Sequence, residues 1–386
     1  MKILILQPNI LRSYPTKFRL EINNYVTNFL LKRNYFDNEF YNKVIKNFFS
    51  QTKFPITSEL AHYGDLTKVL GSENVFSIDR YNPYVFEKNF SKSVNFDWEN
   101  YPTAYGYQAP TFIKSNHIFD MVKKVNIVLA SIKYGSNLNE ILKFAKKRGV
   151  FIALFDNIDH ENIYLNKSED PYRGFKEEEF DVYFKKDIPL ELRNDKLIPI
   201  APVPTKFEEQ DAGKLVWEDR TTTIYFKGAY RKNITRSDRL EICQLLKNKF
   251  PSTSINLNEN HISESKYRIE AQNSKILLSP AGRVWCSYRH TNLAKYNVPL
   301  LLPRPNCKTV SNDFLFDDDA IYYDTALKYG KFEIKNFERL QKKIKEVISE
   351  SKLANEMSRN MYEKIMTKHT TLARSQYIIN KIKSLL

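Results

Sequence analysis

Two apolar runs, separated by a helical pattern, constrain this chain more than any other feature. The runs cover residues 125–130 and 150–155, and each has the length of one buried strand. Between them, apolar residues recur at helical spacing, basic residues fill 146–148, and Gly149 follows, which is typical of a helix C-terminus. A strand, a helix and a strand of these lengths predict a βαβ unit with parallel strands.

The same alternation extends over both halves of the chain. In the first half, further strands are expected at 2–7, 180–184 and 197–200, helices within 17–50, and irregular structure over 80–115. A polar stretch, 205–221, then has the composition of an interdomain connection. In the second half, the expected strands are 221–226, 254–257, 275–278, 298–302 and 320–323, and the expected helices are 235–249, 263–273, 288–296, 336–349 and 353–386. The predicted fold class is α/β, with two doubly wound, Rossmann-like parallel-sheet domains that face each other across a cleft.

Composition narrows the class of protein. The chain has 386 residues, of which 42% are hydrophobic, so it can bury large cores and is not a disordered sequence. Three cysteines without a CxxC pair indicate neither a disulfide framework nor a zinc ribbon, and we expect a reducing, cytoplasmic location. The apolar run at the N-terminus, within residues 2–7, is too short for a signal peptide. No apolar run in the sequence is long enough to span a membrane.

The charge of +15 suggests an anionic partner, which could be nucleic acid, an acidic lipid surface or a phosphorylated substrate. A basic, solvated surface explains the charge equally well. Glycine is scarce: the ten glycines never lie within six residues of one another, which excludes both the P-loop and the GxGxxG fingerprint. Any phosphate must therefore be held mainly by side chains.

The segment 274–303 is the most specific part of the sequence. It reads as a strand that ends near Ser279, a turn that contains Gly282, a helix that starts near Ser287 and Tyr288, and a further strand. Arg283, Arg289 and His290 accompany that helix start. Free N–H groups and guanidinium groups together would bind a diphosphate. The alternative is structural: Ser287 caps the helix and Arg289 pairs with an acid.

This segment resembles the donor-binding region of GT-B glycosyltransferases, in particular the exostosin-like and the spore-maturation CgeB-like groups. Those proteins open a helix with Ser-x-Arg, which Ser287-Tyr288-Arg289 matches. They usually carry glycine before the next strand, where this chain has Asn297, a residue that tolerates the left-handed conformation.

Two further segments are similar to the same groups. Residues 224–231, with Gly228 and Arg231, followed by Arg236 and Arg239, match the strand and glycine turn that open the C-terminal domain. By this resemblance Gly228 admits the ligand closely and Arg231 or Arg236 reaches a phosphate, whereas Arg239 is more simply a surface arginine. Residues 368–374 are similar to a terminal-helix segment, in which His369 and Arg374 are expected to be structural.

The resemblance implies a catalytic base in the first domain, without selecting one. Asp156, Asp159 and His160 follow a buried strand, where ligands bind in open α/β sheets, and His62 and Asp65 form a rival site. Turn formation accounts for these residues equally well. We expect no metal, since GT-B enzymes generally do without one, and we interpret residues 317–319, three aspartates, as a solvated turn.

The implied function is metal-independent transfer of a sugar from a nucleotide-sugar donor to a hydroxyl of a glycan or lipid-linked acceptor, such as a bacterial surface glycan. The donor is a substrate, and no cofactor is implied. Residues 1–205 would bind the acceptor, 206–370 the nucleotide sugar, and 371–386 would form a terminal helix that packs back on the first domain. Basic helices at 331–350 and 364–385 suggest a peripheral position on an acidic membrane surface. The alternative is a basic, non-enzymatic nucleic-acid-binding protein, although no nucleic-acid recognition module is present in the sequence.

Overall fold

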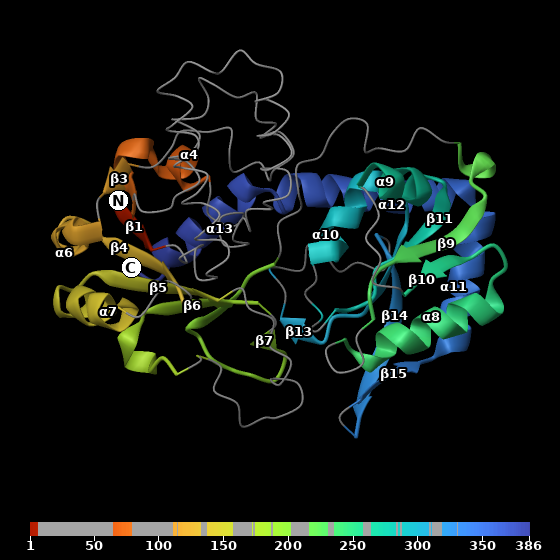
Figure 1. The fold of residues 1–386 in the computed structure, drawn as a ribbon, viewed down its shortest axis with the longest axis horizontal. Coiled ribbons are helices and arrows are strands. Elements are labelled where there is room, and N and C mark those ends of the chain that lie inside the picture. The colour runs from red at the N-terminus through yellow and green to blue at the C-terminus, as the bar shows by residue number, and fades with distance from the viewer. Residues whose placement is uncertain are drawn as a thin grey trace, which may run out of the picture. The chain divides into compact units, whose positions relative to one another are not determined.

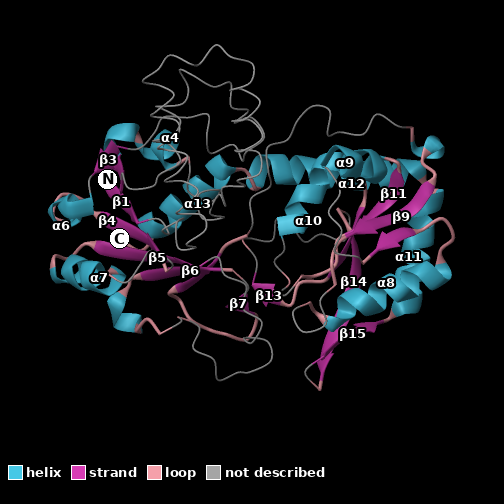
Figure 2. Ribbon diagram, viewed as in Figure 1, coloured by secondary structure: helices cyan, strands magenta, loops and turns pink. Residues whose placement is uncertain are grey.

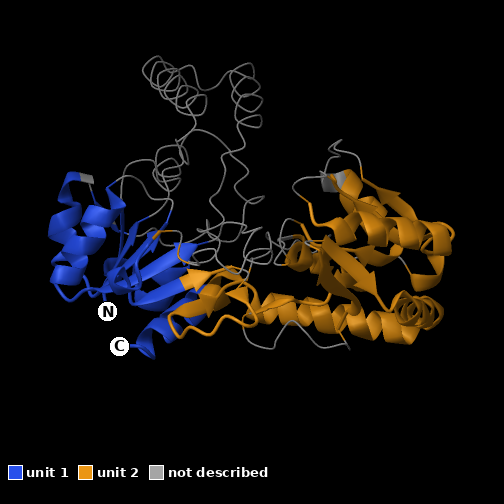
Figure 3. Ribbon diagram, turned by 90° about the horizontal axis from the view of Figure 1, so that it is seen from below, with its two compact units in different colours: residues 1–156, 175–183, 375–386 blue, residues 157–174, 184–374 orange. Residues whose placement is uncertain are grey.

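The protein consists of two compact units, which we describe separately (Figure 3). The first comprises residues 1–156, 175–183 and 375–386, and the second comprises 157–174 and 184–374. The computed structural model describes residues 1–6, 65–78, 111–113, 115–132, 137–156, 172, 174–186, 188–201, 216–230, 235–257, 264–282, 285, 288–308, 310, 319–329 and 331–386.

A seven-stranded sheet, in the order β3-β2-β1-β4-β5-β6-β8, organises the first part of the chain (Figures 1 and 2). The pairs from β3 to β5 are parallel. The strands are β1 (Ile3–Leu6), β2 (Val75–Ile78), β3 (Thr111–Ile113), β4 (Ile127–Ser131), β5 (Phe151–Asp156), β6 (Val182–Lys185) and β8 (Leu197–Pro199). The accompanying helices are α4 (Leu66–Leu70), η2 (Ser72–Asn74), η5 (Ser115–His117), α6 (Ile118–Val122), α7 (Leu138–Lys147) and η6 (Glu177–Glu179).

The predicted βαβ unit is confirmed in β4, α7 and β5, whose strands are parallel neighbours. Every residue of β1, β4 and β5 is buried, because the strands lie inside a layered α/β structure and need apolar side chains on both faces. Gly149 adopts a φ of +67°, the left-handed conformation that ends a helix.

Two strands of this sheet, β2 and β3, were not predicted. The prediction of irregular structure over 80–115 is wrong at Thr111–Ile113, which pairs in parallel with β2. Three residues are too few for a hydrophobic period to show, so only the neighbouring strand identifies β3. The helices expected within 17–50 lie outside the described residues.

The second unit contains a six-stranded sheet in the order β10-β9-β11-β12-β14-β15, shown at the right of Figure 2. The strands are β9 (Thr222–Lys227), β10 (Ser254–Asn256), β11 (Ser274–Leu278), β12 (Leu300–Pro303), β14 (Ile321–Lys328) and β15 (Lys331–Lys335), and only the last pair is antiparallel among the described pairs of this sheet. The helices are η8 (Trp217–Asp219), α8 (Ser237–Lys249), α9 (Glu264–Gln272), α10 (Tyr288–Leu293), η9 (Ala294–Tyr296), α11 (Phe337–Ser349) and α12 (Ser351–Lys368). A small antiparallel pair joins β7 (Ile188–Pro189) to β13 (Cys307–Lys308).

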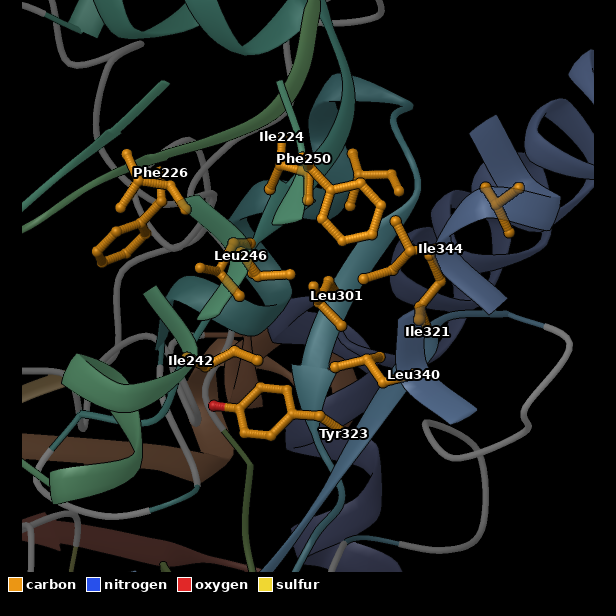
Figure 4. Packing of buried hydrophobic residues seen from close by; sticks show 14 of the residues in the cluster. Ile224, Phe226, Ile242, Leu246, Phe250, Leu301, Ile321, Tyr323, Leu340 and Ile344 are labelled. Atoms are coloured by element: carbon orange, nitrogen blue, oxygen red, sulfur yellow. The ribbon is translucent and has the colours of Figure 1, made fainter. Parts of the chain in front are cut away.

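Both faces of this second sheet are buried. Ile224 and Phe226 of β9 belong to a core that includes side chains of α8, α11 and α12, part of which Figure 4 shows. Tyr225, between them, belongs to a second core with side chains of α9, α10 and α12. Successive residues of a strand point to opposite faces, so a strand between two helical layers is apolar throughout.

The end of the chain matches its prediction in part. The helical pattern expected over 353–386 forms two helices, α12 and α13 (Thr371–Lys383), and α13 begins where the terminal helix 371–386 was expected. The hydroxyl of Thr370 accepts a hydrogen bond from the backbone N–H of Ala373 at 3.2 Å, so a new helix starts there. Likewise, the strand expected at 320–323 continues to Lys328 and turns back into β15, which was not predicted.

No helix in the described parts of the chain combines the length and the apolar character that crossing a membrane requires.

Candidate functional site

The candidate site lies at the carboxyl edge of the second sheet, between β9 and β11. These strands are parallel neighbours, although β10 separates them in sequence. The chain places β10 on one side of β9 and β11 on the other, so the strand order reverses between β9 and β11. Ligands of open α/β sheets bind outside the carboxyl ends of the strands at such a switch point. Gly228 follows β9 directly and Ser279 follows β11, so both predicted turns meet at this point.

Arg239, in the first turn of α8, holds these two turns together. Its Nε donates a hydrogen bond to the carbonyl of Ala281 at 2.8 Å, and its Nη1 donates to the carbonyl of Ala229 at 2.7 Å. The backbone N–H of Arg236 donates to the carbonyl of Gly282 at 3.0 Å. A buried guanidinium thus fixes the turn after β9 against the turn after β11.

Arg289, in α10, approaches the same turns. Its guanidinium carbon lies 5.0 Å from the centre of the Phe226 ring, and that of Arg239 lies 5.9 Å from the same ring. A Cβ atom at Gly228 would lie only 2.8 Å from both Nη atoms of Arg289. Glycine is therefore required at 228 for the guanidinium to lie against the backbone, while a Cβ at Gly282 would make an ordinary contact of 3.6 Å with Arg239.

The two arginines make this edge electropositive. Burial lowers the pKa of Arg239 to about 10, with a further contribution from the charge of Arg289, and burial also lowers the pKa of Arg289. Both stay protonated at pH 7. Among the described residues no carboxylate lies within ion-pair distance of Arg239, whose described hydrogen bonds go to carbonyl oxygens. Two desolvated positive charges near one ring favour an anion beside them.

Arg236, one of the two arginines predicted to reach a phosphate, makes its hydrogen bonds to side chains of the protein itself. Its Nε and Nη2 donate to the two carboxylate oxygens of Asp238 at 2.9 and 3.1 Å, and its guanidinium carbon lies 3.6 Å from the centre of the Phe332 ring. Further bonds reach Asn306 and Thr325. The charge of Arg236 is therefore compensated by Asp238, and its contribution to the site is to position the start of α8.

His290 also makes contacts within the protein with both ring nitrogens. Nε2 lies 2.7 Å from the carbonyl oxygen of Trp285 and must be the donor, since a carbonyl only accepts; Nδ1 then accepts from the Ser279 hydroxyl at 2.8 Å. Burial lowers the pKa of His290 to about 3, so the ring is neutral at pH 7. Ser279 and His290 thus order the turn after β11 and add no positive charge.

The helix that opens the predicted diphosphate segment is short. Of the predicted 288–296, α10 takes Tyr288–Leu293 and a 3-10 turn takes the rest. Asn297 then adopts a φ of +52°, which confirms the left-handed conformation expected where the resembling families carry glycine. Several predicted ligands lie outside the described residues and stay predictions, namely Arg231, Arg283 and Ser287; of Tyr288 only the backbone, in α10, is described.

The candidate bases belong to the first part of the chain. Asp156 ends β5, at the carboxyl edge as predicted, and its buried carboxylate accepts a hydrogen bond from the Tyr183 hydroxyl at 3.2 Å. Asp65 precedes α4 and lies 3.5 Å from the amino group of Lys68; burial raises its pKa and Lys68 opposes that rise. Asp159, His160 and His62 lie outside the described residues.

Asp319 corrects the prediction of a solvated turn over 317–319. Its side chain is buried and forms an ion pair with Lys364 of α12, so the carboxylate contacts a helix and is not exposed to solvent. Asp317 and Asp318 are outside the described residues. No group of three or more His, Cys, Asp and Glu side chains able to hold a metal occurs among the residues that the structure describes. His369 and Arg374 are buried and hydrogen-bond to each other at the start of α13.

Arg239 and Phe226 are the main features of the site that the sequence did not single out. The sequence predicts a surface arginine at 239, whereas Arg239 is buried between two turns. Its neighbour Arg289 is 50 positions away, and no spacing in the sequence indicates that the two converge.

Comparisons with known proteins gave matches among solved structures. No protein-family model matches the chain, and no curated protein matches its sequence. Among solved structures, the lipopolysaccharide outer core galactosyltransferase WaaB is similar with a TM-score of 0.50 and 10% identity over 100% of both chains. HepE from Anabaena, solved with UDP and glucose, is similar with a TM-score of 0.45 and 8% identity over 100% of both chains. TarM is similar with a TM-score of 0.40 and 14% identity. The match covers 67% of this chain and 55% of the length of TarM.

The likeness to WaaB and the two sheet topologies confirm the predicted fold class, a mixed α/β protein with two Rossmann-like units of the GT-B type. At 10% identity the likeness concerns the fold. The exostosin-like and CgeB-like subgroup stays a prediction.

Proposed function

We propose that this chain is a glycosyltransferase that moves a sugar from a nucleotide-sugar donor to a hydroxyl group of an acceptor. One observation carries the proposal: two arginines, the buried Arg239 and the partly buried Arg289, lie near the Phe226 ring at the switch point of the second sheet. The fold is one that a galactosyltransferase, WaaB, also has. The donor diphosphate is the anion that suits this edge.

The arginines have separate roles in the proposed reaction. Arg239 positions the turns after β9 and β11, since its hydrogen bonds go to Ala229 and Ala281. Arg289 supplies bidentate donors to the diphosphate, beside the turn at Gly228. As the glycosidic bond to the diphosphate breaks, negative charge grows on the leaving group. Donors that are already in place stabilise that charge without reorganisation.

An acidic or histidine side chain would accept the proton of the acceptor hydroxyl. The candidates are Asp65, Asp156, Asp159, His160 and His62. Among the two described ones, Asp65 has a pKa raised by burial, which brings a carboxylate nearer to the range of a general base at neutral pH. We propose Asp65 first for this reason.

The remaining features of the proposal follow the family resemblance. They are a surface glycan or lipid-linked acceptor, catalysis without a metal or cofactor, and a cytoplasmic enzyme that is peripheral to a membrane. The functional boundaries proposed are 1–205 for acceptor binding, 206–370 for donor binding, and 371–386 for the terminal helix.

Substitution of Arg289 tests the proposal. Because charge-assisted hydrogen bonds contribute about 1.5–3 kcal/mol each, Arg289→Gln should weaken binding of UDP or another nucleoside diphosphate at least about tenfold and abolish transfer. Isothermal titration over a panel of nucleoside diphosphates and nucleotide sugars measures the binding. The matched control is Arg359→Gln, an exposed arginine of α12, which should bind as the wild type does.

Two outcomes would contradict the proposal. Turnover by Arg289→Gln at the wild-type rate would remove the proposed site. Failure of every nucleotide to bind, together with steeply salt-dependent binding of DNA or RNA, would favour the nucleic-acid-binding alternative.

A further inference from the structure

The tip of the β14–β15 hairpin carries features that folding alone does not explain. Tyr329 directly follows β14, and Lys328 and Lys331 are the facing end residues of the two strands. In Figure 1 the paired ends of β14 and β15 extend away from the helices of the second unit. Three properties of this tip, taken in turn below, each disfavour the folded state or its solubility.

The first property is a pair of like charges. Lys328 and Lys331 are directly opposite each other in the antiparallel register, and both are exposed. Like charges in this position repel each other and destabilise a hairpin. Lys328 also lies over the Tyr329 ring, with its Nζ 5.5 Å from the ring centre, so the ring and this ammonium group form one surface.

The second property is the backbone of Tyr329, whose φ is +49°. This left-handed conformation is unfavourable for a bulky side chain, and hairpin turns of two residues usually carry Asn, Asp or Gly there. The third property is exposure. Tyr329 is 93% exposed and the neighbouring Leu327 is 45% exposed, so the tip presents an aromatic and an aliphatic side chain to solvent.

The base of the hairpin adds further positive charge. A hollow of about 240 Å³ lies between β14, β15 and α11, with four cationic side chains in its lining: Arg304, Lys335, Arg339 and Lys343. Three carboxylates accompany the cations, in the pairs Arg304–Asp324 at 2.8 Å, Lys335–Glu333 at 3.4 Å and Lys343–Glu346 at 3.0 Å. With the two tip lysines, six cations face three carboxylates, a net charge of +3. Lys328 is four positions beyond Asp324, so the hollow and the tip are about 13 Å apart along the strand.

We propose that the β14–β15 hairpin is a docking site for a membrane surface that contains anionic lipids. In the docked state Tyr329 and Leu327 enter the headgroup region, the tip lysines face lipid phosphates, and the hollow at the base accepts an anionic headgroup. Tyrosine favours this position because one end of its side chain is apolar and the other polar. An anionic bilayer suits a tip that combines an aliphatic side chain, an aromatic one and two lysines, whereas nucleic acid offers no apolar interior for Leu327.

This inference rests on the membrane-peripheral position in the proposed function, which it assigns to a named surface, and it does not depend on the proposed donor site. Its test is co-sedimentation with vesicles of pure phosphatidylcholine and vesicles that also contain phosphatidylglycerol. The wild-type chain should bind only the anionic vesicles. The double variant Lys328→Gln/Lys331→Gln should bind about thirtyfold more weakly, since each lysine near an anionic surface contributes about fivefold. The matched control removes two exposed lysines of α7, Lys143→Gln/Lys147→Gln, and should bind within about twofold of the wild type because those lysines lie outside the hairpin surface.

A second variant separates docking from folding. Tyr329→Asn creates the Asn-Gly turn that hairpins prefer, so it should raise the melting temperature, by about 2–4 °C for relief of one strained residue in a unit of this size. The same change should weaken vesicle binding. Opposite effects of one substitution on stability and on binding are expected only if Tyr329 serves a partner.

Three outcomes would overturn the inference. The first is equal binding to neutral and anionic vesicles. The second is binding by the Lys328→Gln/Lys331→Gln variant that equals that of its control. The third is absence of vesicle binding together with hairpin-dependent binding of a soluble polyanion such as heparin or duplex DNA. A failure here would leave nucleotide binding at Arg289 unaffected.

Discussion

Replacement of Gly228 by alanine gives the most direct test of how the candidate donor site is built. A Cβ at this position would lie 2.8 Å from both Nη1 and Nη2 of Arg289 and 3.0 Å from the Phe226 ring. Ordinary contacts of a Cβ begin near 3.4 Å, so the guanidinium must move by about 0.6 Å or more. One added methyl group therefore displaces the side chain that we expect to bind the diphosphate.

The effect on stability should be small. Gly228 does not have a positive φ in the left-handed range, so alanine adopts its backbone without strain. Alanine also restricts the unfolded chain, which stabilises a protein by about 0.4–1 kcal/mol and offsets part of the crowding at Arg289. We expect the free energy of unfolding of Gly228→Ala to stay within about 1 kcal/mol of the wild type.

The effect on nucleotide binding should be large. Loss of one of two charge-assisted hydrogen bonds removes about 1.5–3 kcal/mol, which corresponds to about 10–150-fold weaker binding. Isothermal titration with UDP or the best-binding nucleotide measures the affinity, and thermal denaturation of the same sample checks the fold. Combined with Arg289→Gln, the alanine should have no further effect, because the side chain that it displaces is already gone.

Two results would refute this reasoning. Wild-type affinity in Gly228→Ala would show that the guanidinium position does not matter for binding. An equal loss of affinity in the wild type and in the Arg289→Gln background would show that alanine acts on the ligand or on the turn, independently of Arg289.

Two further predictions concern stability. Asp238→Asn leaves the guanidinium of Arg236 without its carboxylate, and the side chains of Asp238 and Arg236 are only 0% and 3% exposed. Urea denaturation should therefore show a loss of about 3–5 kcal/mol in the free energy of unfolding. The control is Asp120→Asn, which breaks an exposed ion pair with Lys123 and should leave the denaturation midpoint unchanged. Burial lowers the pKa of His290 to about 3, whereas the pKa in the unfolded chain is about 6.5. As the pH falls, the unfolded state therefore binds a proton before the folded state does. The free energy of unfolding should decrease from about pH 6.5 toward pH 3, by about 1.4 kcal/mol per pH unit. Urea denaturation at pH 7 and pH 5 should therefore show a smaller loss for His290→Gln than for the wild type, and equal losses would contradict the neutral ring.

Much of the second unit could be predicted because its strands are apolar on both faces. Runs such as 221–226 and 275–278 stand out from the polar segments around them, and the structure has strands there at Thr222–Lys227 and Ser274–Leu278. The left-handed turn at Asn297 was also predictable, since a residue that tolerates positive φ stands where the resembling families have glycine. These features depend on a few neighbouring residues.

The hairpin and Asp319 could not be predicted in the same way. β15 has five residues, of which only Phe332 is buried, so no hydrophobic period marks it, and it forms because β14 offers it an edge. Asp319 looked solvated because acidic residues usually are, but α12 supplies Lys364 as its partner from 45 positions away. In both cases the deciding contact comes from a distant part of the chain.

By itself, the sequence determined that this is an α/β protein, that strands end next to Gly228 and Ser279, and that arginines lie nearby. It also excluded a glycine-rich phosphate loop. Only the tertiary structure decided that β11 lies beside β9, so that Arg239 and Arg289 meet at one ring and Arg236 pairs with Asp238. The physical reason is that hydrophobic periodicity records whether a strand is buried, whereas the order of strands depends on which edges pair, and that information is not local.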